Sequence, residues 1–169
     1  MIKKAFLFIS LILFVSCHQE IRTDSLILDI EAVVQNTDSI NAYYTTDNSI
    51  EFKDPQSFWT KIEGSKKNQK IRIIFPDTIR PKQIRLDFGR NVLQKDIVLN
   101  EIKFSYQEKS FEAKGEEIYW IFRVDDSNTS VDKLTGNLKR RNPKQINGPS
   151  LYPAGNKLFK KLNELYSEN

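Results

Sequence analysis

The chain has 169 residues, of which 39% are hydrophobic and 28% are charged, a composition typical of a folded globular protein rather than a disordered one. Without Lys3 and Lys4, which lie in a predicted leader, 24 basic residues face 22 acidic ones, and this net charge of +2 is too small to indicate nucleic-acid binding. The single His and single Cys exclude most metal sites and most Ser-His or Cys-His catalysis, so we expect no enzyme activity, no metal and no cofactor.

The first 17 residues have the layout of a secretory signal. Two lysines precede an apolar run from Ala5 to Val15, which is too short to cross a bilayer as a helix. The run ends in Phe14-Val15-Ser16-Cys17, which resembles the lipobox of bacterial lipoproteins and is similar to the form found in Bacteroidota. The resemblance implies that residues 1–16 are a signal peptide and that Cys17 carries acyl chains such as palmitate.

An ordinary cleaved signal that leaves an unused cysteine is the alternative. Cys17 is the only cysteine and therefore has no disulfide partner in the chain, which favours lipid attachment. Residues 17–24 are mostly polar and predict a short tether between membrane and domain. Because His18 rather than Asp follows Cys17, analogy with lipoprotein sorting in enteric bacteria indicates the outer membrane. We therefore expect a lipid-anchored protein of the cell envelope and leave the leaflet open.

Alternation of apolar and polar residues with a period of two dominates the rest of the chain and predicts β-strands. The expected strands cover residues 26–34, 40–44, 58–62, 71–75, 84–88, 97–106 and 111–113. In the sixth strand Ile97 and Leu99 have one parity, whereas Ile102 and Phe104 have the other. An extra residue, a β-bulge near Asn100-Glu101, would keep both pairs on one face.

The last third of the chain is less regular. Residues 116–122 fit one or two helical turns or a final strand. Residues 125–153 are polar and contain three prolines, so we expect them to be mostly loop. From Asn156, a candidate N-cap, to Tyr166 the apolar residues follow the spacing of an amphipathic helix. The sequence thus predicts one all-β domain over residues 25–169, a β-sandwich with a C-terminal α-helix.

Three carboxylate pairs are candidates for acid–base chemistry. Glycosidases use two carboxylates across a cleft, but with 22 acidic residues some pairs are inevitable, and we interpret these as solvated surface. The pairs are Asp29 with Glu31, Glu116 with Glu117, and Asp125 with Asp126. Residues 126–132 space their oxygen-bearing side chains like a calcium loop but lack its Gly and Glu, so a polar loop is favoured and an irregular calcium site stays open.

Two basic clusters lie in expected loops, Lys66-Lys67 and Lys139-Arg140-Arg141. Acidic residues elsewhere balance them, which favours solvated loop charge. Contact with anionic lipid headgroups or acidic glycans is the alternative, because the protein is expected on a membrane.

Aromatic side chains are the best lead to a ligand, because sugars stack their apolar faces on Tyr and Trp. The candidates are Tyr43, Tyr44 and Trp59, and neighbours on a strand point to opposite faces, so one of the two tyrosines must face outward. Arg85 and Asp87 lie opposite the apolar side of their strand, on either a solvated or a binding surface. Core packing is the alternative for the rings. Tyr119 and Trp120 are weaker candidates because their segment is unassigned.

The segment QIRLDFG at 83–89, followed by IVLNEIKF at 97–104, resembles a strand pair of galactose-binding-like jelly-roll domains. The resemblance implies a jelly-roll-like β-sandwich and a role in glycan binding. In that family the binding residues lie in variable loops, so the resemblance assigns none to this chain.

Two functions are consistent with these features. One is a non-catalytic envelope lipoprotein that recognises a glycan or another surface. The other is a structural or accessory envelope lipoprotein that binds a protein partner. An exposed aromatic cluster with nearby carboxylates and amides would favour the glycan, and a flat apolar patch of several hundred Å² would favour the protein.

Overall fold

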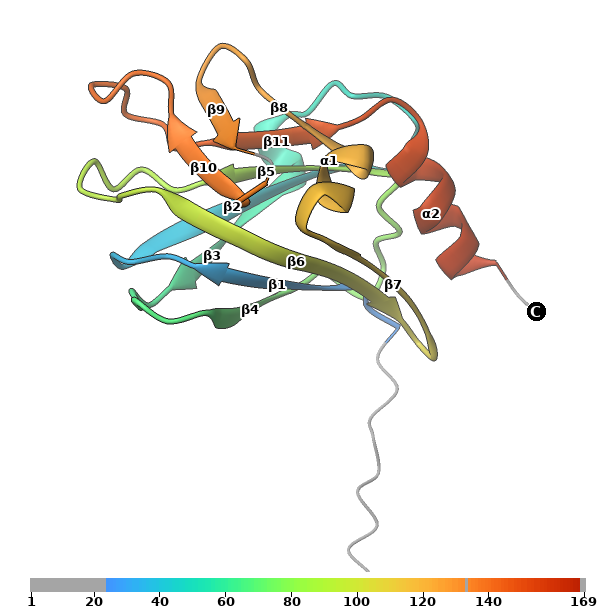
Figure 1. Cartoon of the computed structure of the whole chain (residues 1–169). Coiled ribbons are helices and arrows are strands. Elements are labelled where there is room, and N and C mark those ends of the chain that lie inside the picture. Colours follow the sequence, from blue (N-terminus) through green and yellow to red (C-terminus); the bar gives the residue numbers. More distant parts are fainter. Residues whose placement is uncertain (1–23, 133, 168–169) are drawn as a thin grey trace, which may run out of the picture.

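Two antiparallel sheets packed face to face form the protein (Figure 1), in a computed structural model that describes residues 24–132 and 134–167. Sheet A contains, in spatial order, β4 (Gln69–Ile74), β1 (Ile27–Val33), β6 (Ile97–Tyr106), β10 (Asn137–Arg140) and β9 (Thr129–Asp132), and β7 (Lys109–Lys114) also pairs with β6. Sheet B contains β3 (Ser57–Ile62), β2 (Asp38–Thr45), β5 (Gln83–Phe88), β11 (Ser150–Pro153) and β8 (Phe122–Val124). The predicted all-β sandwich is confirmed, whereas the predicted signal peptide and Cys17 lie outside the described residues.

All seven strands predicted from the alternation are present, as β1 to β7. The alternating apolar side chains of the longer strands are buried between the sheets: Leu28 and Ile30 of β1 and Ile84 and Leu86 of β5 are fully buried. Burial of this kind stabilises a strand only when the buried positions share one face, which is why the pattern is visible in the sequence. Core side chains extend from Leu26 to Leu165, so the described residues enclose a core of their own.

The predicted bulge in β6 is also confirmed. Glu31 of β1 lies opposite Glu101, but the next residue, Ala32, lies opposite Leu99, so Asn100 is the extra residue. Because of it, Leu99 and Ile102 both point into the core, where each is essentially inaccessible to solvent.

Residues 125–153 are mostly loop, as predicted, but the prediction missed three short strands within them. This stretch holds β9, β10 and β11, each of four residues, which complete both sheets. A strand this short buries too few side chains to produce alternation; β10, for example, buries only Leu138. The ambiguous residues 116–122 contain both expected structures, because a 3-10 turn (Gly115–Glu117) and α1 (Ile118–Ile121) lead directly into β8.

The C-terminal helix α2 (Lys157–Tyr166) is present as predicted and contacts β5, β6 and β7. It buries Leu158, Leu162 and Leu165, and the Tyr166 hydroxyl donates a hydrogen bond to the Pro81 carbonyl (3.1 Å). Asn156 occupies the N-cap position but makes no side-chain capping bond. The helix lies at the end of the sandwich where β1 begins (Figure 1), and we call the opposite end the distal end. No helix within residues 24–132 and 134–167 is long and apolar enough to span a membrane.

Candidate functional site

The outer face of sheet B brings together most of the residues singled out from the sequence. Tyr43, Arg85 and Asp87 all point outward from the two central strands β2 and β5, and Trp59 points outward from the edge strand β3. Tyr44 points the other way and packs edge-on against Phe75, with ring centroids 6.2 Å apart. Tyr43 is therefore the outward tyrosine of the pair, and Tyr44 does not belong to this face.

A row of alternating aromatic and cationic side chains crosses this face, and we call it the Tyr–Arg ladder (Tyr43, Arg85, Tyr152 and Arg123). Tyr43 lies directly opposite Arg85 on adjacent strands, and Tyr152 lies directly opposite Arg123. The Arg85 guanidinium is 4.9 Å from the centroid of the Tyr43 ring and 4.5 Å from that of Tyr152, and Arg123 is 5.0 Å from the Tyr152 centroid. Cation–π attraction thus links four strands of the sheet.

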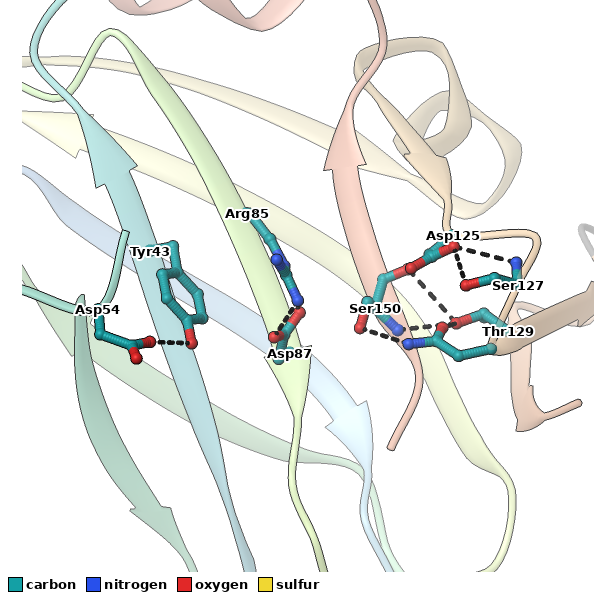
Figure 2. A network of polar contacts seen from close by, with 9 residues as sticks. Tyr43, Asp54, Arg85, Asp87, Asp125, Ser127, Thr129 and Ser150 are labelled. Carbon is teal, nitrogen blue, oxygen red and sulfur yellow. Dashed lines mark hydrogen bonds and ion pairs between the residues drawn. The ribbon is translucent and has the colours of Figure 1, made fainter. Parts of the chain in front are cut away.

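Asp87 holds the Arg85 guanidinium in place (Figure 2). Arg85 donates from Nε to Oδ1 at 2.8 Å and from Nη2 to Oδ2 at 2.6 Å, a bidentate geometry that fixes the plane of the guanidinium. Burial acts to lower the pKa of Arg85, but the hydrogen bonds to Asp87 and its charge outweigh burial and raise that pKa above its usual value. The ladder is therefore preorganised rather than a set of freely moving side chains.

The β2–β3 loop lies against the ladder and limits its movement. The Tyr43 hydroxyl donates a hydrogen bond to Oδ1 of Asp54 (3.0 Å; Figure 2), and the Phe52 ring contacts the Tyr152 ring edge-on with centroids 5.9 Å apart. Burial raises the pKa of Tyr43, and the hydrogen bond to Asp54 adds to this effect, so the hydroxyl remains a donor at neutral pH.

A hollow of about 490 Å³ lies beside the ladder and is formed mainly by the β2–β3 loop. It begins at Thr45, which points outward from the same strand as Tyr43. Its lining is mostly polar and hydroxyl-rich, and consists of Thr45, Thr46, Asp47, Ser49, Glu51, Lys53, Pro55 and Gln56. The size fits one or two sugar rings, since small-molecule sites commonly measure about 300–1,000 Å³.

Trp59 is the most exposed aromatic side chain of sheet B, with 46% of its surface accessible, and Arg90 lies 5.3 Å from its ring centroid. Between Trp59 and Asp87 in the sheet lies Asn41, which pairs with both in register. The Asn41 side chain is buried, yet its Oδ1 has no hydrogen-bond donor among the described residues. A buried acceptor without a partner is costly, so this position favours a bound hydroxyl or water.

A polar network of the β8–β9 turn borders the other side of the face (Figure 2). The Asp125 carboxylate accepts hydrogen bonds from the backbone and hydroxyl of Ser127, and the Thr129 hydroxyl accepts one from the Ser150 backbone. Burial acts to raise the pKa of Asp125, but the bonds from Ser127 and the charges of Arg85 and Arg123 lower it overall. Within the described parts of the chain, no three His, Cys, Asp or Glu side chains are grouped so that they could hold a metal ion.

One of the carboxylate pairs interpreted as solvated surface proves different. Asp29 is buried on the outer face of sheet A, because Arg72 and Lys70 of the neighbouring strand cover it with ion pairs at 2.7 and 2.9 Å. Burial raises the pKa of Asp29, and the hydrogen bonds and charges of these two cations lower it further than burial raises it. The prediction of solvation is therefore wrong for Asp29, which has a structural role away from sheet B.

The weaker aromatic candidates lie apart from the Tyr–Arg ladder. Trp120 is 60% exposed on α1, the short helix that leads into β8 and contacts α2. Burial raises the pKa of Tyr119 to about 12, and its hydroxyl has no hydrogen-bond partner among the described residues.

Sequence reasoning missed half of the ladder. Tyr152 and Arg123 lie in segments that were expected to be loop or were left unassigned, so nothing indicated which face they share. The one available signal was Leu151-Tyr152-Pro153, an apolar–aromatic run inside an otherwise polar stretch.

Comparisons with known proteins add no family to this picture. No protein-family model matches the chain, and no curated protein and no solved structure matches it significantly.

Proposed function

We propose that this protein is a non-catalytic, lipid-anchored protein of the bacterial cell envelope that binds a glycan on the outer face of sheet B. The observation that carries the proposal is the Tyr–Arg ladder with Trp59 beside it on the same face. Aromatic rings offer stacking surfaces for sugar rings, and the fixed Arg85–Asp87 pair offers donors and acceptors for hydroxyl groups.

Three further features support a carbohydrate over a protein partner. The central cation of the ladder, Arg85, is paired with the Asp87 carboxylate, and such a neutral pair suits a ligand with many hydroxyl groups and little charge. Among the strands of sheet B, Trp59 is the one exposed large apolar side chain, so this face has no broad apolar patch. The residues that line the hollow beside the ladder are mostly polar and supply hydroxyl, amide and carboxylate groups.

A glycan array tests the proposal directly. The domain from residue 21 onward, which contains the whole core, is applied to the array together with a Tyr43→Ala variant. Binding of a defined glycan by the unaltered domain, with loss of that signal in a Tyr43→Ala protein of unchanged circular dichroism, is the expected result. If no glycan is retained, the proposal is wrong and the alternative of an accessory lipoprotein with a protein partner replaces it.

The membrane anchor has a separate test. In the native host, Cys17→Ser should prevent lipid attachment and leave the protein unprocessed or released from membranes, because acyl chains hold it there by burial of many CH₂ groups. Mass spectrometry of the mature native protein should find an acylated Cys17, and a free thiol at that position would contradict the anchor.

A further inference from the structure

The distal end of the sandwich gathers both basic clusters of the sequence. β6 begins where β1 ends, since Val33 lies opposite Val98, so the β5–β6 loop lies at the end away from α2 (Figure 1). The antiparallel registers bring the β3–β4 loop, the β8–β9 turn and the chain leaving β10 to the same end. We define the distal end by residues 63–68, 89–96, 125–128 and 139–149.

This end is strongly basic. It contains eight cations, which are Lys66, Lys67, Arg90, Lys95, Lys139, Arg140, Arg141 and Lys144. It contains four acids, which are Glu63, Asp96, Asp125 and Asp126. Asp96 pairs with Lys139 at 3.0 Å and Asp126 with Arg141 at 3.8 Å, whereas Lys95 and Lys144 have no ion-pair partner in the described parts of the chain.

Exposed large apolar side chains lie on the same loops as several of these cations. In the β5–β6 loop Val92 is 61% and Leu93 is 76% exposed, and in the β10–β11 loop Ile146 is 68% exposed. The three side chains thus come from two separate loops. Apolar side chains on loops surrounded by Lys and Arg match the chemistry of an anionic membrane, whose headgroups attract cations and whose acyl boundary accepts hydrocarbon.

Side chains from other parts of the protein hold the backbone around Val92 and Leu93 through hydrogen bonds. Arg140 donates to the carbonyls of Asn91 (2.9 Å) and Gln94 (3.2 Å), which flank Val92 and Leu93 on either side. The Asn36 side chain donates to the Leu93 carbonyl at 2.6 Å. Because the carbonyls are bonded from within the protein, the loop presents its side chains outward, and little further ordering is needed for insertion.

A hollow of about 290 Å³ separates the two loops. Val92 and Lys95 line it from the β5–β6 loop, and Lys139, Arg140 and Pro143 line it from the other side. The lining also contains the Asp96 carboxylate, which pairs with Lys139, so three cations face one acid there. This net positive charge suits the phosphate of a lipid headgroup.

We propose that the distal end docks on the surface of an anionic lipid bilayer. Val92, Leu93 and Ile146 enter the boundary between headgroups and acyl chains, while Lys95, Lys144 and the neighbouring cations contact lipid phosphates. The five side chains named here do not belong to the Tyr–Arg ladder and are distinct from Cys17, although the distal end shares Arg90 and the β8–β9 turn with the border of the sheet B face.

Vesicle sedimentation tests this docking with the anchor-free domain from residue 21 onward. The domain is mixed with phosphatidylcholine vesicles that contain or lack phosphatidylglycerol, at low and at high salt. Two variants remove the proposed contacts, Val92→Ser/Leu93→Ser and Lys95→Glu/Lys144→Glu. The matched controls are Leu134→Ser, an 85% exposed side chain in the β9–β10 turn and outside the residues that define the distal end, and Lys160→Glu, an exposed cation on α2.

The domain should sediment with phosphatidylglycerol vesicles at low salt and dissociate at high salt. Each loop variant should weaken binding about tenfold, whereas the controls should bind like the unaltered domain. Three results would each overturn the proposal: failure to bind the anionic vesicles, equal binding to neutral ones, or equal loss in the loop variants and the controls. Circular dichroism of every variant separates loss of docking from loss of fold.

Discussion

Replacement of Arg85 by Ala tests whether the contacts at the centre of the Tyr–Arg ladder stabilise the fold or whether Arg85 behaves as an ordinary surface arginine. A surface arginine can be removed with a change of no more than about 0.5 kcal/mol in the free energy of unfolding. Arg85 is not such a residue, since its side chain is 23% exposed and that of its partner Asp87 is 21% exposed. The substitution leaves the Asp87 carboxylate partly buried without its two donors.

The expected magnitude follows from these contacts. Loss of hydrogen bonds to a charged group costs about 1.5–3 kcal/mol, and each cation–π contact with a neighbouring tyrosine contributes about 0.5–1 kcal/mol. Residual solvation of the Asp87 carboxylate offsets part of this loss. We therefore expect Arg85→Ala to destabilise the domain by about 2–3 kcal/mol, and Arg85→Lys to lose about half as much because it keeps the charge but not the bidentate geometry.

Urea unfolding followed by tryptophan fluorescence measures the effect, which should lower the midpoint by about 1 M. Arg123→Ala is the matched control, because this arginine is exposed and stacks on one tyrosine only; it should cost about 0.5–1 kcal/mol. The double variant Arg85→Ala/Asp87→Ala should reveal a coupling energy of about 1–2 kcal/mol. A change below about 0.5 kcal/mol for Arg85→Ala would refute a preorganised ladder.

Three further substitutions test the packing around this face and the buried ion pair of sheet A. Leu86→Ala truncates a fully buried side chain of the central strand β5 and should cost about 2–5 kcal/mol in urea unfolding, so a cost below about 1 kcal/mol would contradict its burial. Asp29→Asn should destabilise the domain most at neutral pH. Because the pKa of Asp29 is lowered in the folded protein, its contribution to stability is present above the ordinary pKa of about 3.9 and is lost as pH falls through the lowered value. A loss of stability that does not depend on pH would refute the ion pairing. Gly148→Ala would place a Cβ atom 1.6 Å from the Phe88 carbonyl oxygen, so thermal unfolding should show a loss of at least about 1–3 kcal/mol, and an unchanged melting temperature would argue against this close approach.

The sequence was most informative where strands are long and one face is buried. In β6 the change of parity between Leu99 and Ile102 located the bulge at Asn100, because ten residues supply enough buried positions to show both phases. In β10 a single buried side chain, Leu138, leaves no period to detect. Short strands at the end of the chain are stabilised by neighbours already in place rather than by their own pattern, so composition alone indicated loop.

Only half of the candidate site could be predicted from the sequence, because the other half depends on which strands are neighbours in the sheet. Strand parity placed Arg85 and Asp87 on the outward face and left one tyrosine of the Tyr43-Tyr44 pair to join them. It could not pair Arg85 with Tyr152, because β11 enters sheet B beside β5 from a part of the chain more than 60 residues away. The spatial order of the strands also explains why the burial of Asp29 was not predicted, because the cations that cover it come from the neighbouring strand β4.

The affinity of the best glycan for Trp59→Ala and Trp120→Ala tests the central claim most directly. Both tryptophans are well exposed, but Trp59 lies on the outer face of sheet B beside the ladder, whereas Trp120 lies on α1, outside the strands of that sheet. Stacking of a sugar on the proposed face predicts that isothermal titration finds a loss of at least about tenfold for Trp59→Ala and no change for Trp120→Ala, with equal melting temperatures. Equal affinities for the two variants, or a loss confined to Trp120→Ala, would contradict the assignment of sheet B as the glycan-binding face.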